Sequence, residues 1–181
     1  MKEVTIGSQI WMTQNLNVST FRNGDPITEA KTDEEWRIAG QKKEPAWCYP
    51  TNGTKYGKLY NWYAVVDSRG LAPLGWHLPS DSGWAKLIDY LGGELTAGLK
   101  MKSRSGWQKN GTDEVGFSAL PGGHRTQNGS FFINNPNTCF WSSTEFNTNQ
   151  AWGQTLKGYE DCIYRTYFFI EEGLFVRCLK D

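Results

Sequence analysis

The fold of this chain is decided near its C-terminal end, where residues 140–145 read FWSSTE, residues 162–170 read CIYRTYFFI and residues 173–178 read GLFVRC. Aromatic and β-branched side chains of this density are typical of strands. Because successive side chains of a strand point to opposite faces, a core can take only about half of the middle segment. Large exposed apolar groups usually mark a contact surface. The segment therefore favours a binding function over catalysis.

The composition predicts a loop-rich α+β fold. A chain of 181 residues can bury roughly two thirds of its unfolded surface, so we expect one domain spanning residues 1–181. Nine Trp, eight Tyr and nine Phe predict a core built from rigid rings, and 20 Gly with 7 Pro indicate many turns.

The charge balance disfavours two classes of partner. Lys plus Arg and Asp plus Glu both total 19, so no global field would recruit nucleic acid or an anionic membrane. No apolar run approaches the roughly 18 residues that span a bilayer, and residues 1–6 indicate a strand rather than a signal peptide. We therefore expect neither nucleic-acid binding nor membrane insertion.

Helix signals occur at three places. Thr32 is predicted to cap a short helix, with Glu35 completing a capping box and Gly40 ending the helix. A second helix starts at Ser80 or Asp81 and ends at the glycines of positions 92 and 93, and residues 94–101 can add further helical turns. The buried stripe of the second helix is predicted at Trp84, Leu87, Ile88 and Leu91.

The two chain ends are expected to lie together. Residues 4–6 and 9–12 flank the turn signal Gly7-Ser8 and predict a hairpin. Because residues 175–179 also have strand composition, we expect residues 4–6 to pair with them.

Catalytic, metal and cofactor sites have little support. His77 and His124 share no metal-binding or base-forming spacing, which favours a hydrogen-bonding role for His77 and a turn role for His124. The four cysteines have no CxxC spacing and are expected to be buried or free thiols, with Cys178 in the core and Cys162 more accessible. Calcium ligands from residues 134–137, 160–161 and 171–172 are an alternative to ordinary solvated turns. We therefore predict no catalytic residue, no metal and no cofactor.

A set of ordered motifs runs through the whole chain. It comprises residues 57–65 (GKLYNWYAV), 75–81 (GWHLPSD), Trp84, 89–93 (DYLGG), 116–123 (GFSALPGG), 140–145 (FWSSTE), 151–152 (AW) and 176–178 (VRC). With these motifs, the chain from Val4 to Asp181 resembles the Fibrobacter succinogenes major paralogous domain. The resemblance implies a C-type lectin-like fold of the formylglycine-generating-enzyme type, with short antiparallel strands, two or three helices, long loops and adjacent termini.

The chain also resembles the variable proteins of diversity-generating retroelements, which use this fold to display changeable side chains. The positions that match the scaffold of those proteins are Trp141, Ser142, Ser143, Trp152, Leu156, Ile163, Arg165, Gly173, Val176, Arg177 and Cys178. The positions that the resemblance places on the ligand-binding surface are Gln154, Lys157, Tyr159, Glu160, Asp161, Cys162, Tyr164, Thr166, Tyr167, Phe168 and Phe169.

The resemblance implies a non-enzymatic module that binds a protein or cell-surface ligand, either at a cell surface, in secreted form or on a phage particle. We expect Tyr164, Tyr167, Phe168 and Phe169 to form the solvent-facing patch, supported by Ile163 and Arg165 from the scaffold side. A carbohydrate-binding module is the alternative function, and rings packed under loops or in a homo-oligomer interface are the alternative for the patch. The related sulfatase-modifying enzymes use a close pair of cysteines, whereas Cys178 has no neighbouring cysteine in the sequence, so catalysis does not carry over.

Overall fold

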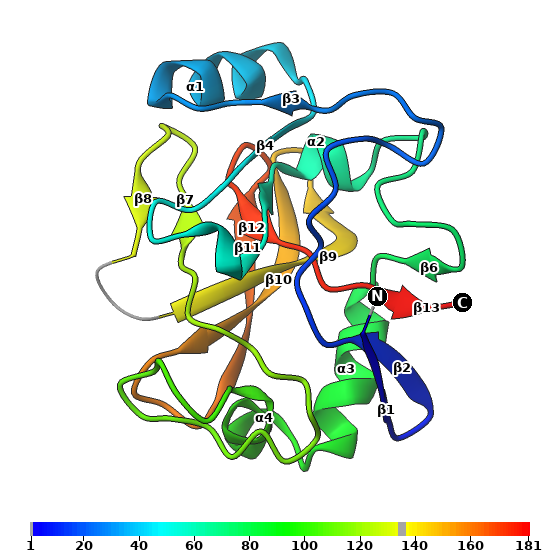
Figure 1. Ribbon diagram of the computed structural model, residues 1–181, viewed down its shortest axis with the longest axis vertical. Coiled ribbons are helices and arrows are strands. Elements are labelled where there is room, and N and C mark those ends of the chain that lie inside the picture. Colours follow the sequence, from blue (N-terminus) through cyan, green and yellow to red (C-terminus); the bar gives the residue numbers. More distant parts are fainter. Residues whose placement is uncertain (1, 134–136) are drawn as a thin grey trace.

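The computed structural model describes residues 2–133 and 137–181, which form a mixed α+β fold with three sheets and four α-helices (Figure 1). This confirms the predicted fold class. In the described residues no helix has both the length and the apolar character that a bilayer crossing requires. The helices are α1 (Asp33–Lys42), α2 (Trp62–Val65), α3 (Asp81–Tyr90) and α4 (Glu94–Met101), together with the 3-10 helix η1 (Thr54–Tyr56).

The largest sheet has seven strands in the order β11-β10-β9-β12-β5-β4-β3. Most of its neighbours are antiparallel, as expected, but β12 runs parallel to β9 and β3 runs parallel to β4. Its three longest strands, β9, β10 and β11, form one end of the sheet, with residues 140–145 in β9 and residues 163–169 in β11. The strands are β3 (Thr28–Glu29), β4 (Ala46–Cys48), β5 (Leu59–Tyr60), β9 (Asn137–Asn147), β10 (Gln150–Lys157), β11 (Ile163–Phe169) and β12 (Leu174–Phe175).

A second sheet joins the two ends of the chain. Its order is β1 (Glu3–Ile6), β2 (Gln9–Met12), β13 (Leu179–Lys180) and β6 (Trp76–His77). The hairpin around Gly7, whose φ is +60°, is confirmed. Figure 1 shows the N and C labels close together, and the Lys180 ammonium lies 2.9 Å from the Glu3 carboxylate.

The predicted direct pairing of the first and last segments is wrong, because β2 lies between β1 and β13. The turn at Gly7 folds β2 onto one edge of β1, which leaves the other edge of β2 for β13. Since Trp11 and Met12 of β2 are buried while Glu3 and Thr5 of β1 are exposed, the central place in the sheet goes to the more apolar strand.

Helix α1 begins as predicted and ends later than predicted. The Thr32 hydroxyl accepts from the Glu35 backbone N–H at 3.1 Å, and the Glu35 carboxylate accepts from the Thr32 N–H at 2.9 Å. The helix continues past Gly40 to Lys42 because the left-handed residue is Lys43, with φ +58°, whose N–H donates back to the Gly40 carbonyl. A side chain at Gly40 would press on Glu171, so this glycine allows close packing rather than ending the helix.

Helix α3 is confirmed in position, cap and buried face. Ser80 accepts from the Gly83 N–H at 3.2 Å, and the predicted stripe is buried throughout. Trp84 meets Trp11 of β2 with ring centroids 4.8 Å apart, so this helix joins the terminal sheet to the main core.

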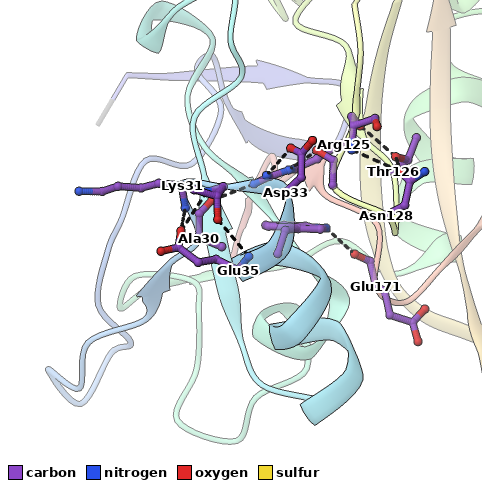
Figure 2. A network of polar contacts seen from close by, with 12 residues as sticks. Ala30, Lys31, Asp33, Glu35, Arg125, Thr126, Asn128 and Glu171 are labelled. Atoms are coloured by element: carbon purple, nitrogen blue, oxygen red, sulfur yellow. Dashed lines mark hydrogen bonds and ion pairs between the residues drawn. The ribbon is translucent and has the colours of Figure 1, made fainter.

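A buried arginine fastens α1 to the third sheet, which pairs β7 (His124–Arg125) with β8 (Phe131–Phe132). Figure 2 shows the Arg125 guanidinium beside Ala30 and Asp33: it donates to the Ala30 carbonyl at 2.8 Å and to the Asp33 carboxylate at 3.2 Å. It also donates to the Gly129 carbonyl at 2.7 Å. Nearby, the Trp36 indole N–H donates to the Glu171 carbonyl at 2.9 Å. The network satisfies the buried charge, so it has a structural explanation.

Candidate functional site

Three aromatic side chains meet on one face of the sheet at the β9–β10 hairpin. They are Phe146 of β9, Trp152 of β10 and Tyr167 of β11, here called the ring cluster. The register of β10 against β11 places Trp152 directly opposite Tyr167. Strand pairing therefore puts Trp152 and Tyr167 on the same face of the sheet.

A bulge in β9 brings the third ring into the cluster. Phe146 is the extra residue between the paired positions Ala151–Glu145 and Gln150–Asn147, where the β9–β10 register shifts. A bulge of this kind re-aims a side chain and increases the local twist. The register shifts a second time opposite Trp152, where Ser143 and Thr144 are not paired with β10. They contact the chain before α3 instead: the Ser143 N–H donates to the Pro79 carbonyl, and the Thr144 hydroxyl accepts from the Asp81 N–H, both at 3.0 Å. The bulged strand thereby also fixes the start of α3.

The rings support one another while remaining open to solvent. Phe146 and Tyr167 are stacked, with centroids 4.8 Å apart and planes at 8°, and Trp152 stands edge-on to Phe146 at 4.7 Å. Phe146 is 43% exposed and Tyr167 is 50% exposed. Phe169, which shares the alternating face of Tyr167, is also exposed. Large apolar groups that are ordered and yet exposed are the main signature of a contact surface here.

Arg165 lies over one face of Trp152, with its guanidinium carbon 3.3 Å from the ring centroid. Its Nε is 2.9 Å from both carboxylate oxygens of Asp81 at the start of α3. The arginine is exposed and lies on the face of the ring cluster, so its predicted place on the scaffold side is wrong. It connects the ring cluster to α3.

The four rings predicted as one patch are divided between the two faces of β11. The β10–β11 register is continuous from Ile163 to Phe169, so odd and even positions face opposite ways. Tyr167 and Phe169 are exposed, while Phe168 is half-buried against Trp141, with centroids 6.0 Å apart. Thr166 lies on the same side as Phe168. Adjacent residues such as Phe168 and Phe169 could share a face only if the strand were bulged.

Tyr164 belongs to a separate polar group. Its hydroxyl donates to the Glu160 carboxylate, and the Lys157 ammonium lies 4.1 Å above its ring. The hydrogen bond from Tyr164 lowers the pKa of Glu160, with a further contribution from Lys157. These three predicted site residues are therefore together, but apart from Tyr167 on the sheet.

The turn between β10 and β11, which contains the predicted site residues Tyr159, Glu160, Asp161 and Cys162, contacts α4 and the residue that follows it. The buried Lys102 ammonium donates to the Glu160 carbonyl at 2.7 Å, and the Asp161 carbonyl accepts from the Leu99 N–H at 2.8 Å. The Cys162 thiol lies 3.8 Å from the Leu95 carbonyl, and a side chain at Gly98 would clash with the 161–162 backbone. Tyr159 is exposed at this turn. Residues 158–162 have clear structural contacts in addition to any contact with a ligand.

Gln154, the remaining predicted residue, is buried at the centre of β10. Its Oε1 has no hydrogen-bond partner, and its side chain lines a pocket with Asp81, Ala85, Ile88, Asp89, Glu94 and Arg165. An unpaired buried acceptor is costly, so this position is unusual for a scaffold strand.

A histidine and a cysteine lie close together beneath the opposite face of the sheet. The Cys139 Sγ is 3.8 Å from the His124 Nδ1. Burial raises the pKa of Cys139 to about 12 and lowers the pKa of His124 to about 4. Both groups are neutral near pH 7, which does not suit a thiolate nucleophile. His124 lies in β7 and packs its ring on Phe132 of β8, rather than shaping a turn as predicted.

The remaining cysteines and His77 have ordinary surroundings. Cys48, Cys139 and Cys178 are buried, Cys162 is half-buried, and all four are free thiols, as expected. His77 forms a hydrogen bond of 2.7 Å with Asp181, which confirms its predicted structural role. In the described part of the chain, no three His, Cys, Asp or Glu side chains gather as metal ligands do. Of the calcium alternative, residues 134–136 lie outside the described residues.

Sequence reasoning missed Phe146 and assigned Trp152 to the scaffold. The turn at residues 157–162 fixes the β10–β11 register, and that register places Trp152 opposite Tyr167. The position of this turn was therefore a signal in the sequence from which Trp152 could have been placed beside Tyr167. Phe146 could not be placed in this way, because strict alternation fails at a bulge.

Comparison with protein families gives a match over nearly the whole chain. The family model described as Fibrobacter succinogenes major domain matches residues 4–180. No curated protein and no solved structure matches the chain.

Proposed function

The chain belongs to the Fibrobacter succinogenes major domain family, and we propose that it is a non-enzymatic binding module whose contact surface is the ring cluster. The observation that carries the proposal is the exposure of Phe146 and Tyr167 in a fixed arrangement. Rings that are already held by one another lose little freedom when a partner covers them, so burying them would favour binding with a small entropic cost.

A protein ligand fits this surface better than a glycan. Sugars bind aromatic side chains by laying their C–H face on a free ring face. Here Phe146 and Tyr167 use one face each against the other, and Arg165 covers one face of Trp152. Fewer ring faces are therefore left for a sugar, while the exposed ring area and the guanidinium of Arg165 are groups to which apolar and polar side chains of a protein can pack. We therefore place the carbohydrate-binding function second.

The finer fold assignment is also part of this proposal. Pairing of β2 with β13, which brings the termini together, and the long loops between short strands support a C-type lectin-like scaffold of the formylglycine-generating-enzyme type. By the same resemblance, the module works as a display scaffold at a cell surface, in secreted form or on a phage particle, with β10 and β11 carrying the changeable positions. The neutral His124–Cys139 pair favours a function without catalysis.

The test is a screen of the chain against a cell-surface protein array and a glycan array, with two variants in parallel. Phe146→Ser/Tyr167→Ser removes the exposed rings of the ring cluster. Phe132→Ser is the matched control, since Phe132 is 44% exposed and lies on β8, outside the cluster. We expect a protein hit whose affinity falls about thirtyfold in the ring variant, the equivalent of a hot spot of about 2 kcal/mol.

The control should bind like the parent chain. Glycan hits that depend on Phe146 and Tyr167 would replace the protein ligand by a sugar. Protein hits that survive the ring variant and are lost in Phe132→Ser would move the contact surface to the opposite side of the sheet.

A further inference from the structure

A small pocket adjoins the ring cluster and has the opposite character. It lies between α3, the start of α4 and the strands β10 and β11, with a volume of about 90 Å³. The charged residues among the described residues that line it are Asp81, Asp89, Glu94 and Arg165, and of the three acidic residues Asp81 is the one that pairs with the Arg165 guanidinium. Three negative groups against one positive group leave a formal charge of −2, which attracts a cation.

The walls of the pocket suit a side chain with an aliphatic stem. Positions 81, 85, 88 and 89 fall on one face of α3, so Ala85 and Ile88 stand between the carboxylates at its two ends. Lysine and arginine bury an apolar stem and keep a charged end among polar groups. The carboxylates are not gathered as metal ligands are, which points to an organic cation rather than a metal ion.

Gln154 supplies an independent sign that the pocket receives a hydrogen-bonding group. Its side chain lines the pocket, is 1% exposed and has no partner for Oε1. Because Oε1 is closed to solvent, a hydrogen-bond donor that enters the pocket would reach this acceptor after a rotation of the side-chain amide. An ammonium or guanidinium carries several donors and no acceptor, which matches this requirement.

Arg165 joins the pocket to the ring cluster. It lines the pocket, pairs with Asp81 and covers Trp152, so apolar and acidic surfaces are continuous. The same contacts show that a guanidinium is accommodated between a carboxylate and an indole at this place.

We infer that the protein partner inserts a lysine or arginine side chain into this pocket while neighbouring apolar side chains cover the ring cluster. The inference rests on the proposed function and adds the chemistry of the partner. Asp89 and Glu94 receive the charge, since Asp81 is already paired with Arg165.

The pocket can be tested without the natural partner. The probes are N-acetyl-arginine amide and N-acetyl-lysine amide, with N-acetyl-citrulline amide as the neutral control, and the readout is the NMR signal of the Gln154 side-chain amide. We expect saturable shifts with at least one cationic probe, weaker binding at high salt, and no saturable shift with citrulline. Equal responses to citrulline and arginine, or no response of Gln154 to either cation, would overturn the inference.

Two double variants distinguish the effect of the pocket's charge on probe binding from the effect of the protein's net charge. Asp89→Asn/Glu94→Gln should raise the Kd of the bound probe at least about fivefold, which corresponds to about 1 kcal/mol. Glu44→Gln/Glu114→Gln changes the net charge by the same amount at exposed positions outside the pocket, and should leave the Kd within about twofold. If both variants weaken binding equally, the pocket is not the site.

The ring variant distinguishes this inference from the proposed function. Phe146→Ser/Tyr167→Ser should leave probe binding unchanged and weaken a protein partner. If the probe binds but the partner does not depend on the rings, the proposed function fails while the cation pocket stands. If the partner depends on the rings but binds Asp89→Asn/Glu94→Gln as well as the parent chain, the inference fails while the proposed function stands.

Discussion

Glu172 shows at the scale of one residue how the fold changes the chemistry of a side chain. It lies half-buried in the turn between β11 and β12, and its N–H donates to the Phe169 carbonyl at 2.9 Å. Burial, followed by the charge of Glu171, raises the pKa of Glu172 to about 7. His124 is shifted in the opposite direction, since burial lowers its pKa to about 4. Both groups therefore favour their neutral forms in the folded protein.

Glu172→Gln should change the pH dependence of stability. A carboxyl whose pKa rises from 4.5 to about 7 on folding stabilises the protein below about pH 4.5, and that contribution is lost as the pH rises to about 7. The variant stays neutral, so its free energy of unfolding should exceed that of the parent by roughly 2–4 kcal/mol at pH 8, with the difference vanishing near pH 4.5. Urea unfolding of both proteins between pH 4.5 and 8.5 measures this, and a difference that does not vary with pH would contradict it.

At the scale of elements, local signals predicted the helices, and strand pairing decided the site. The capping box at Thr32 and the stripe on α3 are properties of a few neighbouring residues, and both were predictable from the sequence. The short helix α2 was missed because four residues are too few to show a helical period. The placement of Arg165 on the scaffold side went wrong because Ile163, Arg165 and Tyr167 share one strand face, and the sequence does not show that this face is buried at Ile163 and exposed from Arg165 onward. Phe146 could not be placed because it is the extra residue of a bulge in β9, where strict alternation of side chains fails.

Leu87→Ala tests α3 as a core element. Leu87 is completely buried between the helix and the sheets, so truncation leaves a cavity in a packed interior. We expect the free energy of unfolding to fall by about 2–5 kcal/mol. Lys86→Ala, at an exposed position of the same helix, is the control and should change it by less than about 0.5 kcal/mol. Similar denaturation midpoints for the two variants would contradict this account of the core.

Phe168→Ser and Tyr167→Ser test the two faces of β11. Phe168 packs against Trp141 on the core side, so its loss should lower the free energy of unfolding by about 2–3 kcal/mol. Tyr167 is half exposed and loses mainly its stacking on Phe146, which should cost about 1 kcal/mol or less. Thermal melting of both variants gives the comparison, and a larger loss for Tyr167→Ser would reverse the assignment of faces.

At the scale of the whole molecule, the two chain ends are joined to each other, whereas the β9–β10 hairpin is exposed to solvent. The β2–β13 pairing and the Glu3–Lys180 ion pair hold the termini together, as the family resemblance led us to expect. The hairpin of β9 and β10 instead carries its aromatic side chains into solvent, with an acid-lined pocket beside them. The resemblance indicated this region for ligand binding, but the choice of Phe146, Trp152 and Tyr167 over the other rings required the register and the bulge.

The central claim is that a partner protein covers the ring cluster, and site-specific photo-crosslinking tests it most directly. A benzophenone side chain placed at position 167 should crosslink to a partner found on the protein array, because Tyr167 would lie inside the contact. The same group at position 132, equally accessible on β8, should give no crosslink above background. Crosslinking at position 132 without crosslinking at position 167 would contradict the claim.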